Sequence, residues 1–311
     1  MQQRLDAARG FSSAALVPVP QGSTPLSLGF IFDVRFLATL DSTTGLPRPA
    51  LVAKLLTEEC DGVYSFPLLK AEFCENLVQC GYAFSAHFAK SNGEAEMPPR
   101  MLDLMDLGWL NDLLLHVVMN PLAQMTMQDQ LQGEVLDYRH GYIVGYSPLL
   151  PHGEATGSEE GRTGARTGEH ASETEIGKEG KVDDSQRLED KHTNYRHTRD
   201  HLVAHSDDAE ATLNVGLATD FVGGDLLFYG RRGSGDESTP LARYRHPRKG
   251  HAVLHVGRQL HEVLPVSKGS RHGLIVWARS LRGVRQGVCP CCWMNGRDPL
   301  RSACICGPRW N

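Results

Sequence analysis

The chain has 311 residues, of which 41% are hydrophobic and 22% are charged, so it carries enough apolar surface to fold around a core. Its formal net charge of −5 excludes a protein whose whole surface binds nucleic acid or an anionic membrane, and nucleic acid is not indicated as a partner. Five of the eight cysteines lie between Cys289 and Cys306, unlike the even spread of a small secreted disulfide scaffold. We therefore expect a soluble intracellular protein, cytoplasmic or nuclear.

Residues 1–62 form a poorly defined N-terminal segment, because proline, threonine and weak patterning leave its elements undecided. Its longest apolar stretch, residues 26–40, is interrupted by Asp33 and Arg35 and is shorter than the ~20 residues that cross a bilayer. We expect no membrane span and no secretory signal.

Residues 63–137 are predicted to be a helical support region. From Phe66 to Val78, apolar residues recur at helical spacing on one face. A second apolar helix is expected from Trp109 to Met119, and we expect Pro121 to stop it.

Residues 138–285 change to a period of two, which is typical of short strands. The predicted strands are 142–146, 211–217, 224–229, 250–256 and 273–278. Several short strands with no helix between them favour a sandwich, barrel or jelly roll, so the expected fold class is α+β.

An insertion at about 151–195 interrupts this region. It has seven glycines, no Phe or Trp, and eleven acidic residues against six basic ones, an excess of five that equals the net charge of the whole chain. Such a composition cannot form a core, so we predict a disordered insertion. Residues 286–311 form a Cys-rich tail, for which four-thiolate zinc binding and reduced thiols are both open.

The candidate chemistry begins at His205 and Asp207, which point to the same face of an extended chain and can chelate one metal ion. His261 can provide a third ligand, 54 residues after Asp207. Two histidines and one carboxylate form the ligand set of non-haem Fe(II) oxygenases, which leaves three positions open. Ten residues later, Arg271 opens the last predicted strand, and its guanidinium suits the distal carboxylate of 2-oxoglutarate.

Three stretches, residues 205–217, 221–228 and 253–261, closely resemble the 2-oxoglutarate- and iron-dependent oxygenase domain-containing family, a branch of the prolyl/lysyl-hydroxylase-like superfamily. The Cys-Pro-x-Cys stretch from Cys289 is also similar to one that follows the domain in these proteins. The chain departs from the family at Gly273, where relatives usually carry Asn.

The resemblance implies a double-stranded β-helix, or jelly roll, supported by N-terminal helices. It also implies that His205, Asp207 and His261 bind Fe(II), that Arg271 holds 2-oxoglutarate, and that Tyr146 helps to bind the same carboxylate. The implied activity is a dioxygenase reaction that consumes O2 and 2-oxoglutarate, releases succinate and CO2, and is sustained by L-ascorbate. The substrate expected at family level is a prolyl or lysyl side chain of a protein, and a small molecule or a nucleic acid stays open.

The sequence also indicates roles for neighbouring residues and allows one rival function. His255 is expected to pack or donate hydrogen bonds behind the ligands, since it lies inside a strand pattern. Asp208 and Glu210 are expected to have surface or hydrogen-bonding roles, and Thr212 and Asn214 are candidates to line the co-substrate pocket. The rival is a catalytically silent jelly-roll binding module whose insertion and tail recruit a partner.

Overall fold

The computed structural model describes residues 8, 10–21, 27–92, 100–149 and 199–286. The predicted disorder of the insertion and the zinc question in the tail therefore fall on residues outside the described ones. No described helix has the length and apolar character needed to cross a membrane.

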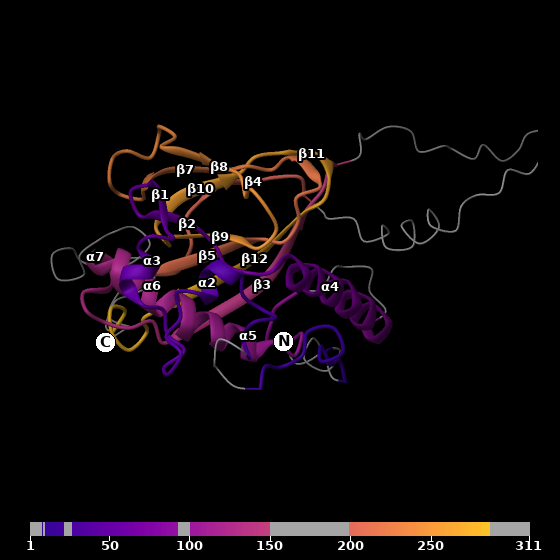
Figure 1. Ribbon diagram of the computed structural model, residues 1–311. Helices are drawn as coiled ribbons and strands as arrows, with labels where there is room; N and C mark the ends of the chain where they lie inside the picture. Colours follow the sequence, from indigo (N-terminus) through magenta and orange to yellow (C-terminus); the bar gives the residue numbers. More distant parts are fainter. Residues whose placement is uncertain (1–7, 9, 22–26, 93–99, 150–198, 287–311) are drawn as a thin grey trace, which may run out of the picture. The chain divides into compact units, whose positions relative to one another are not determined.

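The core of the described chain is built from two antiparallel sheets (Figure 1). The larger sheet has the strand order β1-β2-β9-β5-β12-β3 and the smaller one has the order β4-β10-β7-β8. The larger sheet contains β1 (Thr57–Cys60), β2 (Val63–Pro67), β9 (His251–Val256), β5 (Ala211–Gly216), β12 (Arg271–Arg279) and β3 (Tyr138–Tyr146). The smaller one contains β4 (Leu202–His205), β10 (Gln259–Val263), β7 (Leu226–Arg231) and β8 (Ala242–Tyr244), and a separate pair joins β11 (Val266–Gly269) to β6 (Phe221–Gly223).

The connections between the sheets give the jelly-roll topology. The chain runs from β3 in the large sheet to β4 in the small one and returns to β5. It then forms the β7–β8 hairpin in the small sheet, and passes through β9, β10 and β12 with one change of sheet at each step. Eight strands wound in this way form a double-stranded β-helix. The predicted α+β jelly roll is thus confirmed.

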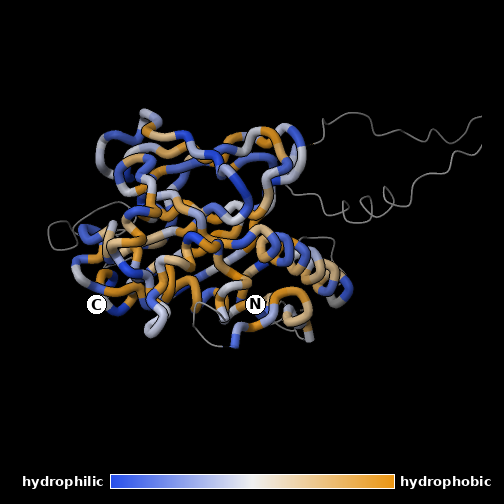
Figure 2. Tube along the Cα trace, viewed as in Figure 1, coloured by the Kyte–Doolittle hydropathy of each residue, from blue (hydrophilic) through white to orange (hydrophobic). Residues whose placement is uncertain are grey.

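Two apolar cores lie on opposite faces of the large sheet. One fills the space between the sheets and includes Phe228, Val253 and Val263. The other lies between the outer face of the large sheet and the helices, where strand residues such as Leu213 and Val276 meet Phe73 and Leu77. Figure 1 shows the helices below the large sheet and the small sheet above it, and Figure 2 shows apolar residues concentrated where the helices meet the large sheet.

The helices are α2 (Val34–Leu37), α3 (Pro49–Val52), α4 (Ala71–Asn92), α5 (Gly108–Leu113), the π-helix η1 (Leu114–Met119), α6 (Asn120–Thr126) and α7 (Gln128–Leu131). The predicted start of the first long helix at Phe66 is wrong. Phe66 and Pro67 belong to β2 and pair with β9, and the helix begins at Ala71. The segment up to residue 62 contributes α2, α3 and β1.

The predicted helix stop at Pro121 is also wrong, because helical structure continues to Thr126. The preceding turn is a π-helix, in which the N–H of Asn120 donates to the carbonyl of Leu115, five residues back. Proline then stands in the first turn of α6, where its missing N–H leaves no hydrogen bond unmade.

Candidate metal centre and co-substrate pocket

The three predicted metal ligands lie together where β4 and β10 meet. His205 is the last residue of β4, and it stands directly opposite His261 of β10 in the antiparallel pairing, with ring centroids 4.4 Å apart. Asp207 follows in the turn before β5, where its N–H donates to the carbonyl of Gly257 (2.8 Å). Neighbouring strands therefore fix the two imidazoles, and a backbone hydrogen bond fixes the carboxylate beside them.

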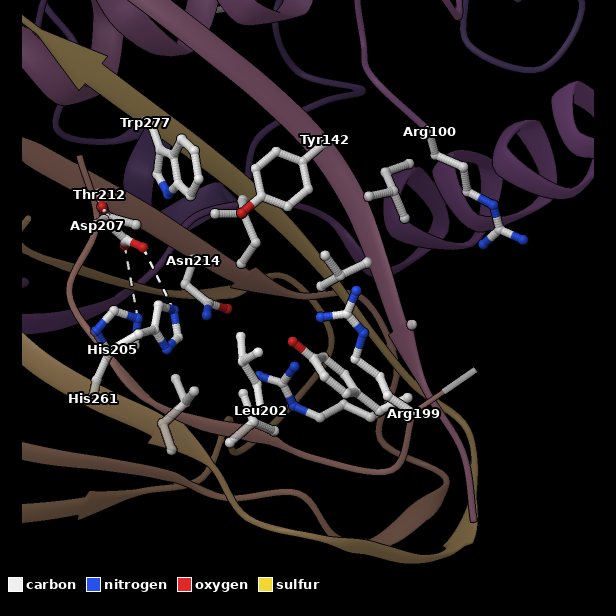
Figure 3. A pocket seen from close by; sticks show the side chains of 18 of the residues that line it. Arg100, Tyr142, Arg199, Leu202, His205, Asp207, Thr212, Asn214, His261 and Trp277 are labelled. Atoms are coloured by element: carbon white, nitrogen blue, oxygen red, sulfur yellow. Dashed lines mark hydrogen bonds and ion pairs between the residues drawn. The ribbon is translucent and has the colours of Figure 1, made fainter. Parts of the chain in front are cut away.

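The geometry suits a divalent cation. One carboxylate oxygen of Asp207 lies 3.6 Å from His205 Nε2 and the other lies 3.7 Å from His261 Nε2 (Figure 3). One ligand atom from each of the three residues lies within 4.8 Å of the others, and this is the only such group of His, Cys, Asp and Glu among the described residues. A structural zinc site would need a fourth protein ligand, whereas two histidines and one carboxylate with the other positions open match the facial ligand set of non-haem iron.

Backbone carbonyls set the tautomers of both imidazoles. His205 Nδ1 donates to Val203 O (2.8 Å) and His261 Nδ1 donates to Gln259 O (2.9 Å). Because a carbonyl can only accept, each Nδ1 carries the proton and each Nε2 keeps a lone pair for a metal. Burial lowers the pKa of His261, which favours the neutral form that a metal binds.

Thr212, on β5, holds the carboxylate from behind. Its hydroxyl donates to Asp207 Oδ2 (2.7 Å), and it is buried. This hydrogen bond orients Asp207 so that Oδ1 faces His205. Thr212 therefore positions a ligand, a role beyond the pocket lining expected from the sequence.

His255 lies behind the three ligands and is fully buried. Its ring centroid is 4.6 Å from that of His261, its Nδ1 donates to Val256 O (2.9 Å), and its Nε2 is 3.9 Å from Asp207 Oδ2. Burial and the neighbouring His261 lower the pKa of His255 to about 3, so the ring is neutral. The structure leaves it outside the group of three.

A pocket of about 480 Å³ extends from the metal centre over the inner face of the large sheet. Its floor consists of alternate residues of the neighbouring strands β3, β12 and β5, which point to the same face. From one end to the other, the pairs are Tyr146 with Arg271, Val144 with Gly273, Tyr142 with Ile275 and His140 with Trp277. On β5, Asn214 pairs with Ile275 of β12, and Thr212 pairs with Trp277.

Arg271 occupies one end of the pocket in an unusual state. Arg271 is only 2% exposed, yet neither its Nη1 nor its Nη2 has a hydrogen-bond partner among the described residues. Burial lowers the pKa of this guanidinium, but arginine keeps its charge. A buried cation with unpaired donors favours an anionic partner, so this end of the pocket fits a carboxylate.

Tyr146 lies directly opposite Arg271, and the guanidinium carbon is 5.4 Å from the centroid of the tyrosine ring. The structure thus brings Tyr146 and Arg271 together in the same pocket as His205, Asp207 and His261.

Asp208 and Glu210 point elsewhere: they pair with Arg279 and Arg285, as the expected hydrogen-bonding role requires.

Several pocket residues are missed by the sequence reasoning. Tyr142 and Trp277 form an aromatic wall, with ring centroids 5.4 Å apart, and Arg100 and Arg199 line the pocket as well. Strand alternation from Tyr146 and Arg271 would have found Tyr142 and Trp277. No local signal marks Arg199, which precedes a strand of only four residues.

No family model matches the chain. A 2-oxoglutarate and iron-dependent oxygenase domain-containing protein of Arabidopsis thaliana, ICU11, is 28% identical over 240 residues, which cover 72% of this chain and 47% of that protein. The Danio rerio 2-oxoglutarate and iron-dependent oxygenase domain-containing protein 2 is 26% identical over 249 residues, covering 78% of this chain and 56% of that protein. The Mus musculus protein of the same name is 42% identical over 91 residues, covering 29% and 26%.

The chain is similar to 2-oxoglutarate and iron-dependent oxygenase domain-containing proteins over about three quarters of its length. It spans about half the length of the Arabidopsis and Danio relatives. A crystal structure of a Pseudomonas putida prolyl-4-hydroxylase matches with a TM-score of 0.36 at 15% identity, over 74% of this chain and 93% of that chain. The strand pairing of this chain itself forms the jelly roll, and a group of two histidines and one carboxylate lies in it.

Proposed function

We propose that this protein is an Fe(II)- and 2-oxoglutarate-dependent dioxygenase that hydroxylates a C–H bond of its substrate. In the overall reaction, the substrate, O2 and 2-oxoglutarate give the hydroxylated substrate, succinate and CO2. The observation that carries the proposal is the buried, unpartnered guanidinium of Arg271 in the same pocket as the group of three ligands. A metal-binding module without this chemistry has no need for a second, buried anion site.

In this proposal, His205, Asp207 and His261 hold Fe(II), which when bound supplies a chelation site for 2-oxoglutarate and a site for O2 activation. Thr212 keeps the carboxylate of Asp207 in place, and the two backbone carbonyls keep Nε2 of each histidine unprotonated. Arg271 pairs with the distal carboxylate of 2-oxoglutarate in a bidentate manner, and Tyr146 offers its hydroxyl to the same carboxylate. Leu202, Leu226 and Val263 exclude water from the adjoining wall of the pocket.

The aromatic wall of Tyr142 and Trp277 supports a protein side chain as the oxidised group, and a prolyl or lysyl side chain is the proposed target. Either side chain offers an aliphatic surface that packs against aromatic rings. L-ascorbate is proposed as the reductant that returns the metal to the ferrous state after turnover without substrate.

The test has two steps on one preparation. Anaerobic addition of 2-oxoglutarate to the Fe(II)-loaded protein should produce a metal-to-ligand charge-transfer band in visible light. Admission of O2 should then release succinate. A protein that binds Fe(II) but shows neither the band nor succinate would be a silent binding module, and the proposal would be wrong.

A further inference from the structure

Arg199 is a second arginine of the pocket, and the proposed reaction does not use it. Its carbonyl accepts a hydrogen bond from the N–H of Ser147, just after the end of β3 (3.1 Å). Because β3 is the edge strand of the large sheet, this bond holds Arg199 at the open side of the pocket floor. Figure 3 shows its side chain reaching into the pocket.

Arg199 lines the same pocket as two tyrosines of β3, Tyr142 and Tyr146. The charge of Arg199 acts on the hydroxyls of both Tyr142 and Tyr146, and it counteracts the rise in their pKa that burial causes. These two tyrosines lie four residues apart on the same face of β3, so the guanidinium lies between the co-substrate end and the aromatic wall.

Charge balance leaves Arg199 without a counter-ion among the described residues. In the proposed complex, the two charges of Fe(II) and the charge of Arg271 would be balanced by Asp207 and the two carboxylates of 2-oxoglutarate. Among the described residues that line the pocket, Asp207 is the only carboxylate, and none of the ion pairs between described residues involves Arg199. Arg100, in contrast, is engaged by Ser85 and lies over the ring of Tyr82.

The other end of the pocket carries a neutral donor. Trp277 Nε1 is buried at the pocket wall and has no hydrogen-bond partner among the described residues. Indole N–H is a donor only, so this end of the pocket offers a donor and no anion.

We propose that the primary substrate is an acidic peptide, and that Arg199 binds a side-chain anion close to the residue that is oxidised. This inference rests on the proposed dioxygenase function and names its substrate class. One arginine at the edge of a pocket suits one carboxylate or phosphate. A nucleic-acid backbone requires a row of cations, and the whole chain carries a net charge of −5.

The experiment uses the full chain loaded with Fe(II) and 2-oxoglutarate under anaerobic conditions. Three sets of capped heptapeptides share a randomised centre and differ only in the flanking residues, which are glutamate, glutamine or phosphoserine. The bound fraction of each set is measured by mass spectrometry after ultrafiltration. A mixed-sequence single-stranded oligonucleotide is tested as a competitor.

We expect the glutamate or phosphoserine set to be retained about threefold to tenfold better than the glutamine set, and added salt to reduce this preference. Whichever anionic set is retained better identifies the anion as a carboxylate or a phosphate. Arg199→Gln should remove the preference. Arg282→Gln is the matched control, because Arg282 is exposed and does not line the pocket, and it should keep the preference.

Equal retention of all sets, or a preference that survives in Arg199→Gln, would overturn the proposal. Displacement of the anionic peptides by the oligonucleotide would overturn the peptide assignment. A fall in 2-oxoglutarate affinity in Arg199→Gln larger than the fall in peptide retention would place Arg199 at the co-substrate instead. The charge-transfer band is recorded on the same sample, so its absence reports failure of the proposed function, whereas a normal band without charge preference contradicts the peptide inference alone.

Discussion

Arg271 and Tyr146 face each other directly across the antiparallel pairing of β12 and β3, with the guanidinium carbon 5.4 Å from the ring centroid. Both belong to a sheet whose strands are paired over nine residues at this point, so the anion site is built on rigid backbone. Gly224 provides the space for it: a Cβ there would lie 2.9 Å from Cδ of Arg271, and the residue has a φ of +69° that favours glycine. In the proposed function, the pocket is therefore organised for the co-substrate carboxylate before it binds.

Arg271→Ala should therefore lose 2-oxoglutarate while keeping iron. Loss of a buried, charge-assisted, bidentate contact costs about 2 to 5 kcal/mol, which corresponds to a weakening of about 30-fold to several thousand-fold. Arg271→Lys should be intermediate, because an ammonium offers only a point charge. Anaerobic titration of the Fe(II) form with 2-oxoglutarate measures both, and an unchanged affinity in Arg271→Ala would show that the carboxylate is held elsewhere, with Arg199 the next candidate in the pocket.

Asp207→Ala should abolish retention of Fe(II), because it removes the only anionic ligand and leaves two neutral imidazoles.

Thr212→Val should weaken Fe(II) binding by about 10- to 100-fold, since the carboxylate loses the hydrogen bond that orients it. Thr212→Ser should restore most of the affinity. His255→Asn changes a residue behind the ligands, and this comparison variant should retain its iron. Iron content after gel filtration measures all four, and stoichiometric iron in Asp207→Ala would contradict the ligand assignment.

The part of this site that could be predicted from the sequence rests on the alternation of side chains along strands and on the spacing of residues along the chain. Strand alternation places Thr212 and Asn214 on one face, and the spacing from His261 to Arg271 places that arginine at the start of β12. Alternation also places Tyr142 and Trp277 on the face of the pocket, but their contact with each other depends on the register of β3 with β12. Register is set by tertiary pairing, and no short-range pattern encodes it.

The errors in the helical region have a similar origin. Phe66 fits a helical face by periodicity, yet it forms β2 because β9 offers a partner strand, and this tertiary contact outweighs local preference. Pro121 would end a regular α-helix, but the π-helical turn before it changes the hydrogen-bond register. A single-turn change of this kind leaves no mark in the apolar pattern.

Asn214→Asp should impair 2-oxoglutarate binding more than Asn214→Ala does. Asn214 Oδ1 and Arg271 Nη1 lie 3.7 and 3.6 Å from the point where a Cβ on Gly273 would stand, so they share one small region of the pocket. A carboxylate at position 214 would act as an internal counter-ion for Arg271 and compete with the co-substrate. We expect a weakening of at least about tenfold for Asp. Equal affinities of the two variants in the same anaerobic titration would contradict this account.

The stability of the metal-free protein should fall in mild acid because of His246. Burial, together with the charge of Arg271, lowers the pKa of His246 from 6.5 to about 3, so the folded state holds a neutral ring while the unfolded chain takes up a proton. The contribution of His246 to the free energy of unfolding is complete above about pH 6.5. It is lost as the pH falls toward 3, by about 1.4 kcal/mol per pH unit. Denaturant unfolding at a series of pH values should show a flatter profile for His246→Leu. A slope identical to that of the wild type would mean that other groups cause the loss.

Removal of residues 152–194, with the flanks joined by a short Gly/Ser linker, should leave the metal centre and the pocket intact. The N–H of Ser147 donates to the carbonyl of Arg199 (3.1 Å), so described residues that precede and follow the removed stretch are already held together. A short linker closes this gap at little entropic cost, because loop closure depends only weakly on length. We expect Fe(II) affinity and the 2-oxoglutarate charge-transfer band to change less than about twofold. A matched variant that keeps the length but replaces residues 152–194 with Gly/Ser separates length from composition. If the deletion unfolds the jelly roll while the replacement does not, the chain needs the length of the insertion, and if both unfold it, the prediction that the insertion contributes nothing to the core is wrong.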